Sequence, residues 1–279
     1  MANDKLIITK TNDGYVVELF AKSNSCVGNG IADVAEGISL LEPNKNQTEE
    51  EQFVRYKEIV EKMDERPVII KAFEKVKDIT ILKTQLRAIL RAAKCGDLSI
   101  MFSKISSTTE LIQLKDILEE CKKELEIEGF EYKKHIKIGV IVEIPSVALM
   151  SYEIARECDY IYIETNSLTN YTFGGNLNNK QIQQFQAAII KLIRLASKGA
   201  HDAGIFCGIC GDIAEDELYI PLLIGLGIDE FSIDTENIEK VRRFINGLDR
   251  SDCKELAEEI LQIRAIEDIE NKLKKFIKY

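Results

Sequence analysis

The feature that most constrains the fold of this chain is the regular alternation of short apolar runs with longer helical patterns. Eight such runs occur along the 279 residues, and they are rich in Ile and Val. Runs that are apolar almost throughout, rather than at every second residue, are typical of a parallel sheet covered by helices. The predicted strands are 15–21, 37–41, 67–73, 98–102, 136–144, 160–164, 204–210 and 230–233.

The segments between these runs carry helix signals. Thr48 with Glu51, and Ser107 with Glu110, have the spacing of capping boxes, and Gly129 is placed to end the second of these helices. Segment 31–36 gives only a short, weak helical pattern, and 251–279 adds one or two amphipathic helices. The other predicted helices are 79–94, 146–157, 180–203, 214–226 and 235–246.

Eight strands that alternate with helices over about 250 residues predict an α/β fold, a (β/α)8 TIM barrel with extra C-terminal helices. We expect a single domain over 1–279, with the barrel at about 14–248 and a helical tail at 251–279. A doubly wound open sheet is the main alternative. No GxGxxG or GxxxxGK[ST] pattern occurs, so the sequence does not support a dinucleotide site or a P-loop.

Charge and cysteine content narrow the function classes. The net charge of -10 disfavours nucleic acid and anionic membranes as partners. No apolar run reaches the roughly 18 residues of a membrane span, and the opening MANDKLIITK lacks the apolar core of a secretion signal. The seven cysteines are scattered and odd in number, which favours reduced thiols over a disulfide framework. We therefore expect a cytoplasmic protein.

Polar side chains follow the predicted strands at the end of a barrel where catalysis takes place. Glu143, in VIVEIPSVAL, is a candidate Mg²⁺ ligand, because Mg²⁺ is usually held by one or two carboxylates together with phosphates and waters. Asp212 and Glu164 are candidates for a second ligand. The alternative is that Glu143 is a strand-end carboxylate bonded to a neighbouring lysine. The full set at the strand ends is Lys22, Glu42, Lys71, Ser103, Lys104, Glu143, Asn166, Ser167, Cys210, Gly211 and Asp212.

The pair Cys207-x-x-Cys210 raises the question of a zinc or redox site. It supplies two ligands where structural zinc needs four, and it is predicted to lie in a strand rather than at a helix N-terminus. His135 is predicted in a surface turn and His201 on a long helix. Neither histidine is a good catalytic candidate, and neither a zinc nor a redox site is favoured.

Several longer motifs recur in the order of a known family. They are AEGISLL, TEEEQFVRYKEIVEKM, KTQLRAILRAA, LSIMFSKISSTTEL, VEIPS, YIYIETNSLTNYT, GICGD and PLLIGLGIDEFSI. Over nearly its whole length the chain resembles the C-terminal barrel of the phosphoenolpyruvate-protein phosphotransferases, within the PEP-utilising enzymes. Members of this family are transferases of the kinase type and act as the first enzyme of the bacterial sugar phosphotransferase system. The resemblance implies a barrel that binds phosphoenolpyruvate (PEP) and Mg²⁺ and that dimerises.

The resemblance also implies roles for single residues, and it shows departures. The family's metal glutamate falls on Glu143, and its second metal carboxylate falls on Ser167. The cysteine that protonates the enolate falls on Cys210. A glycine of the family falls on Glu164. The remaining ligand-binding positions fall on Asn166 and Asp212, with Lys71 and Glu42 in place of phosphate-binding arginines.

These departures lead to three hypotheses. PEP carries about three negative charges, and arginine grips phosphate with a two-pronged fork that lysine and glutamate lack. The first hypothesis is a degenerate, non-catalytic barrel with a regulatory or dimerising role. Such a barrel cannot run the family's reaction by itself, because the phosphohistidine part is absent. Under this hypothesis, binding of a new ligand by Lys71, Lys22 and Glu143 stays an open alternative.

The second hypothesis is a Mg²⁺-dependent enzyme that binds PEP, pyruvate or a related keto acid, through phosphotransfer or enolate chemistry. The third is interaction alone, as a homodimer or as a mixed dimer with a full-length PEP-protein phosphotransferase. The sequence leaves open whether the chain is an enzyme, and it predicts at most a weakened Mg²⁺ site.

Overall fold

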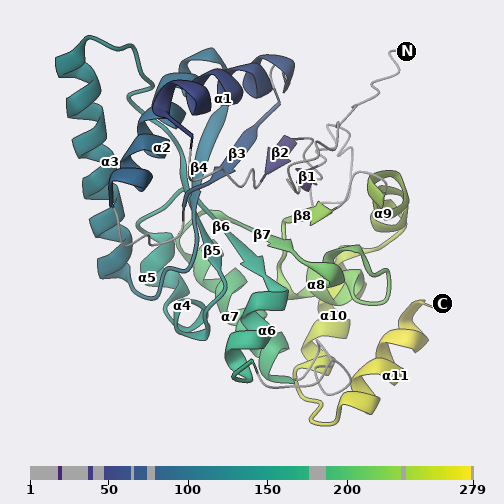
Figure 1. Cartoon of the computed structure of the whole chain (residues 1–279). Coiled ribbons are helices and arrows are strands. Elements are labelled where there is room, and N and C mark those ends of the chain that lie inside the picture. Colours follow the sequence, from purple (N-terminus) through teal and green to yellow (C-terminus); the bar gives the residue numbers. More distant parts are fainter. Residues whose placement is uncertain are drawn as a thin grey trace.

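The computed structural model of the chain describes residues 18–20, 37–39, 47–63, 66–73, 79–175, 187–233 and 237–277, the first two segments as backbone alone. Eight strands form a closed barrel in sequence order, which confirms the predicted fold class (Figure 1). They are β1 (Glu18–Phe20), β2 (Gly37–Ser39), β3 (Val68–Lys71), β4 (Leu98–Phe102), β5 (Ile138–Val142), β6 (Tyr160–Glu164), β7 (Phe206–Cys210) and β8 (Glu230–Ile233).

Strand β1 is the exception to an otherwise parallel sheet. Strands β2 to β8 pair in parallel with their neighbours, whereas β1 runs antiparallel to both β2 and β8. A parallel pair needs a long crossover, usually a helix, whereas antiparallel neighbours need none.

Helices cover the outside of the barrel. They are α1 (Glu49–Met63), α2 (Ile79–Ala92), α3 (Thr108–Glu128), α4 (Pro145–Leu149), α5 (Ser151–Ala155), α6 (Thr165–Thr172), α7 (Ala187–Asp202), α8 (Ile220–Leu226), α9 (Ile238–Asn246), α10 (Arg250–Ile260) and α11 (Ile266–Ile277), with short 3₁₀ turns at Ala93–Cys95 and Asp212–Glu215. Helices α10 and α11 are the predicted extra C-terminal helices. No helix in the described part of the chain is long and apolar enough to cross a membrane.

Both predicted capping boxes start helices. In the first, Glu51 Oε2 accepts the Thr48 backbone N–H at 2.7 Å, and Thr48 Oγ1 accepts the Glu51 N–H at 3.3 Å. In the second, Ser107 Oγ accepts the Glu110 N–H at 3.3 Å, but Glu110 reaches back one residue further, to the N–H of Ser106 at 2.9 Å. Gly129 then ends α3 with a φ of 78°.

Two predicted helices are wrong in detail. The expected helix at 146–157 is split into α4 and α5 at Met150, whose φ of -107° and ψ of 27° leave the helical region. The break lets Ser151 approach α7, where its Oγ donates to the Leu195 carbonyl at 2.9 Å. The expected helix at 214–226 begins only at Ile220, because Pro221 favours the first turn of a helix and cannot serve its interior.

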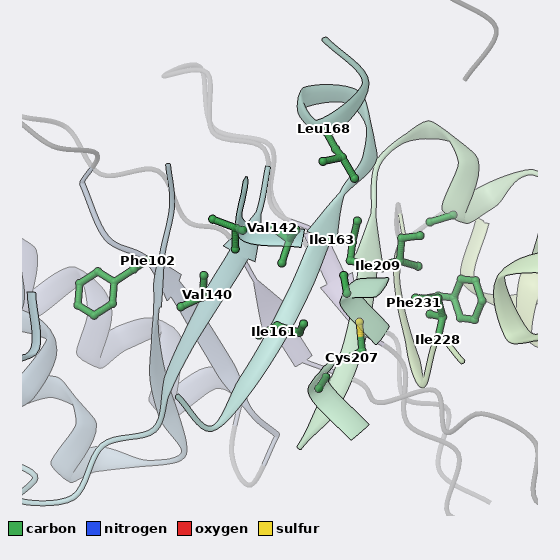
Figure 2. Close-up of a cluster of buried hydrophobic side chains, with 14 of the residues drawn as sticks. Phe102, Val140, Val142, Ile161, Ile163, Leu168, Cys207, Ile209, Ile228 and Phe231 are labelled. Carbon is green, nitrogen blue, oxygen red and sulfur yellow. The ribbon is translucent and has the colours of Figure 1, made fainter. Parts of the chain in front are cut away.

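The strands separate an outer apolar layer from the barrel interior. Side chains that face the helices form the main core, which Figure 2 shows around Val140, Ile161 and Ile209. A second, smaller cluster fills the barrel itself and includes Ile69, Met101, Ile141, Tyr160 and Tyr162. This interior cluster lies inside the part of the barrel formed by β3 to β6, and polar residues follow at the carboxyl ends of the strands.

One glycine makes room for this interior packing. A Cβ at Gly139 would lie 2.0 Å from Tyr160 Cε2, so any side chain there would displace the ring. The Tyr160 hydroxyl donates to Ser99 Oγ at 3.1 Å, which satisfies its polar tip inside the barrel.

Candidate functional site

The predicted site residues lie at the carboxyl ends of consecutive strands, at one end of the barrel. Lys71 ends β3, Glu143 directly follows β5, and Cys210 ends β7. Asn166 and Ser167 lie in the first turn of α6, and Asp212 begins the turn after β7. Lys22 and Glu42 lie outside the described residues. Glu143 is 4% exposed and Cys210 is 1% exposed, so both functional groups are set below the surface.

The Glu143 carboxylate is bonded to the backbone of the neighbouring strand end. Its Oε2 accepts the N–H of Lys104 at 2.7 Å. Lys104 has a φ of 52°, a left-handed conformation that costs a non-glycine residue about 1–2 kcal/mol. The hydrogen bond to a carboxylate offsets part of this cost. Glu143 thus holds the turn after β4 in place, through the amide of Lys104.

Helix α6 was not predicted from the sequence, and it reshapes the mouth. Glu164 is its N-cap: Oε1 accepts the Asn166 N–H at 2.9 Å, and Oε2 accepts the Ser167 N–H at 2.7 Å. Segment TNSLTNYT is rich in residues with low helix propensity, and glutamate is not among the preferred N-caps. Both oxygens of Glu164, a candidate second metal ligand, therefore bind the chain's own amides.

The ends of β6 and β7 are tied together beside Cys210. Asn166 Nδ2 donates to Asp212 Oδ1 at 3.2 Å, which joins two predicted ligand-binding residues. Thr165 Oγ1 donates to the Cys210 carbonyl at 3.1 Å, and Cys210 Sγ lies 3.6 Å from the Ile163 carbonyl oxygen. The structure therefore brings Asn166, Asp212 and Cys210 to one side of the mouth.

Lys71 is positioned by a residue that the sequence did not single out. Gln85, on α2, is fully buried; its Nε2 donates to the Lys71 carbonyl at 3.0 Å, and its Oε1 accepts the Phe73 N–H at 2.7 Å. The side-chain amide of Gln85 is thus hydrogen-bonded to the backbone both at the end of β3 and just beyond it. A glutamine on the apolar face of KTQLRAILRAA was the available signal.

Within the described residues, the other polar candidates are not grouped as metal ligands. In the described segments, no group of three or more His, Cys, Asp or Glu side chains is placed to hold a metal ion. Cys207 and Cys210 lie in β7 as predicted, and burial raises the pKa of the Cys207 thiol. His201 Nε2 lies 2.6 Å from Asp229 Oδ2, beside the start of β8 and thus at the end of the barrel away from the mouth.

Comparison with known sequences agrees with the resemblance read from the motifs. Residues 74–250 match the family described as PEP-utilising enzyme, PEP-binding domain. The chain is 34% identical to the phosphoenolpyruvate-protein phosphotransferase of Listeria monocytogenes, over 98% of this chain and 55% of that protein. It is 35% identical to that of Priestia megaterium, over 80% of this chain and 44% of that protein. The chain therefore spans about half the length of these curated relatives.

Comparison with solved structures gives the same fold class. A citrate lyase of Burkholderia xenovorans superimposes with a TM-score of 0.52 at 17% identity, over 70% of this chain and 62% of the lyase. RipC of Yersinia pestis superimposes with a TM-score of 0.50 at 11% identity, over 75% of this chain and 87% of RipC. At these identities the likeness concerns the fold alone.

Proposed function

Because the chain belongs to the PEP-utilising enzymes, of which it carries the PEP-binding domain, we propose that it is a degenerate barrel of the phosphotransferase type. In this proposal it binds PEP weakly or not at all, transfers no phosphoryl group by itself, and acts through regulation or dimerisation. The observation that carries the proposal is that two strand-end carboxylates, Glu143 and Glu164, are bonded to the chain's own backbone amides.

The loss of arginines supports weak PEP binding. By the resemblance to the family, Lys71 falls at the position of an arginine, and a lysine ammonium lacks the planar fork that makes two parallel bonds to a phosphate. One charge-assisted hydrogen bond contributes about 1.5–3 kcal/mol. Since about 1.4 kcal/mol is tenfold in affinity, losing one such bond weakens binding by roughly ten- to a hundredfold. Glu42, at another arginine position, adds repulsion of the anion.

The residues of the mouth fit a weakened Mg²⁺ site better than an intact one. Glu143 supplies one carboxylate, and Ser167 stands where the second falls. A serine oxygen is neutral, whereas Mg²⁺ sites rely on one or two carboxylates together with substrate phosphates. When bound, the ion would neutralise charge on a phosphate or an enolate oxygen, with Glu143 as the protein ligand.

A single-domain organisation over residues 1–279 is part of the proposal, with the tail packed on the barrel. Helix α10 contacts α8 closely: a Cβ added at Gly225 would lie 2.0 Å from the carbonyl oxygen of Cys253. Cys253 and Leu256 of α10 are buried in the main core. The tail is therefore expected to unfold together with the barrel rather than separately.

Homodimerisation is also proposed, through the surface that follows β5. Leu149 is 66% exposed, and Met150 and Tyr152 next to it are 42% and 44% exposed. A run of large apolar side chains of this kind is a common mark of an interface. Sedimentation of the chain and of Leu149→Asp tests the proposal, because a dimer that uses this surface dissociates in the variant. Co-elution with a full-length PEP-protein phosphotransferase would instead identify a mixed dimer.

Calorimetric titration with PEP, with and without Mg²⁺, tests the degenerate-barrel proposal. We expect no saturable heat at micromolar to low millimolar PEP. The variant Ser167→Asp, which restores the second carboxylate position, should gain Mg²⁺-dependent binding, and Glu143→Ala in that background should remove it. Mg²⁺-dependent binding by the unaltered chain that disappears in Glu143→Ala would overturn the proposal.

The grouping of Cys210 with Asn166 and Asp212 favours one alternative, an enzyme acting on an enolate of pyruvate or a related keto acid. A thiol beside a bound enolate can exchange a proton with carbon, which is general acid–base chemistry. Exchange of the pyruvate methyl protons in deuterated water tests this. An exchange rate that exceeds the rate with Mg²⁺ alone, and that falls in Cys210→Ala, supports the enzyme. An exchange rate equal to the rate with Mg²⁺ alone excludes it.

A further inference from the structure

The turn after β4 carries two unfavourable features at the mouth of the barrel. Lys104 has a φ of 52°, and among the described residues it is the one non-glycine residue with a positive φ. The preceding Ser103 is buried, and its Oγ has no hydrogen-bond partner within the described part of the chain. Such features persist only where the surrounding structure holds them in place, and they are concentrated at functional sites.

The segment after β5 holds this turn in place. Glu143 Oε2 accepts the Lys104 N–H at 2.7 Å, and Ser146 Oγ donates to the Ser106 carbonyl at 3.2 Å. On the other side of the turn, Ile105 is buried in the main core, so its side chain anchors the turn against the helices. The left-handed backbone at Lys104 is thus fixed from two directions, with its N–H directed at the Glu143 carboxylate.

The same hydrogen bond orients Glu143. Carboxylates that bind metal ions are usually hydrogen-bonded themselves, and the partners that orient them strongly affect metal affinity. The Lys104 N–H is a neutral donor, so it orients the carboxylate without cancelling the negative charge that attracts a cation. Since Oε2 already accepts this N–H, Glu143 is better suited to bind a cation through a single oxygen, which agrees with a weakened site.

We propose that Lys104 is a positioning residue for the metal site, and that it acts through its backbone amide rather than through its side-chain charge. Its left-handed conformation places the N–H against Glu143, and the hydrogen bond fixes the orientation of the carboxylate that would hold a divalent cation. The inference rests on the weakened Mg²⁺ site proposed above, and it names a residue that determines the affinity left in that site.

Two substitutions of Lys104 separate the backbone from the charge. Lys104→Gly keeps the N–H and favours a positive φ, whereas Lys104→Pro removes the N–H and fixes φ at about -65°. Both variants remove the same positive charge from the mouth. A difference in metal affinity between them therefore reports on the backbone alone.

Mn²⁺ is the probe, because it binds the same oxygen ligands as Mg²⁺ and its free concentration can be measured by electron paramagnetic resonance. The titrations use the Ser167→Asp background, in which the second carboxylate position is restored. There, Lys104→Pro should bind Mn²⁺ about ten- to a hundredfold more weakly than Lys104→Gly. Helix ellipticity in a urea titration checks that both variants are folded.

A second measurement needs no metal. The Lys104 amide proton should be protected from solvent exchange in the unaltered chain, and it should lose this protection in Glu143→Ala, which removes the acceptor. If Lys104→Pro does not fold, Lys104→Val replaces it, because a β-branched residue strongly disfavours a positive φ and the same charge is lost.

Weaker Mn²⁺ binding in Lys104→Pro than in Lys104→Gly, together with loss of amide protection in Glu143→Ala, supports the positioning role. Equal Mn²⁺ affinity in the two Lys104 variants, or unchanged amide protection, overturns this role and leaves the metal site of Glu143 in place. Absence of Mn²⁺ binding that depends on Glu143 in the Ser167→Asp chain overturns the weakened metal site itself, and the positioning role with it.

Discussion

Gln85 is predicted to control both the stability of the barrel and the position of Lys71. Its side chain is fully buried and makes two hydrogen bonds to the backbone at the end of β3, one to the Lys71 carbonyl and one from the Phe73 N–H. Gln85→Leu keeps nearly the same volume but removes both bonds. The perturbation is therefore polar rather than a matter of packing.

The magnitude follows from the two groups left behind. Each buried backbone group without a partner costs about 1–3 kcal/mol, and the apolar leucine recovers part of this because its own burial is favourable. We expect the free energy of unfolding to fall by about 2–4 kcal/mol. Because the chain has no tryptophan, helix ellipticity in a urea titration is the suitable readout.

Gln262→Leu is the matched control, since Gln262 lies exposed beyond α10 and such surface changes usually stay within about 0.5 kcal/mol. A loss below about 1 kcal/mol in Gln85→Leu would refute the reasoning, because it would mean that water or another group satisfies both backbone atoms.

Three further predictions concern packing, thiols and acid. The Arg91 guanidinium pairs with Glu49 and Glu50, and it lies 4.2 Å and 4.4 Å from the ring centroids of Phe53 and Phe130. Arg91→Lys should therefore lower the free energy of unfolding by about 1–3 kcal/mol in the same assay. An unchanged free energy would contradict a role for the planar guanidinium. Burial raises the pKa of Cys121 and Cys253 to about 12, whereas Cys95 is exposed. Iodoacetamide at mildly alkaline pH should therefore alkylate Cys95 before Cys121 and Cys253, as mass spectrometry of peptides can show. Equal rates at these three cysteines would contradict the burial. The hydrogen bond from Lys83 lowers the pKa of Glu124 in the folded state. The carboxylate therefore stabilises the fold at neutral pH, and this contribution is lost as the pH falls through the pKa of the folded state. Glu124→Gln should lower the urea midpoint at pH 7 more than at pH 3, and an equal loss at both pH values would contradict the pairing.

The thiol prediction also corrects an expectation from the sequence. Reduced cysteines usually pack as small hydrophobes, and the sequence predicts this for Cys26, Cys95, Cys121, Cys158 and Cys253, of which Cys26 lies outside the described residues. Cys121 and Cys253 do so, and Cys158 is half-buried, but Cys95 is exposed at the turn between α2 and β4. Its position follows from where the turn ends, which apolar periodicity does not define.

The sequence by itself determined the barrel and most of its elements. Strands β4, β6 and β8 have the predicted bounds, because a buried parallel strand must be apolar throughout, and that pattern is visible in one dimension. The capping boxes at Thr48 and Ser107 were equally visible, since a cap is a local contact between residues three positions apart. The site residues could be placed at strand ends for the same reason.

The tertiary structure alone decided what those residues bind to. Helix α6 was not predicted although its cap is local, because its residues have low helix propensity and Glu164, which accepts its first amides, is not a preferred N-cap residue. Glu143 is bonded to Lys104, 39 residues away in the chain, and Gln85 reaches the end of β3 from α2. Such contacts depend on distances between segments that only packing fixes, so the sequence could single out a glutamine on an apolar helix face but could not identify the atoms that it binds.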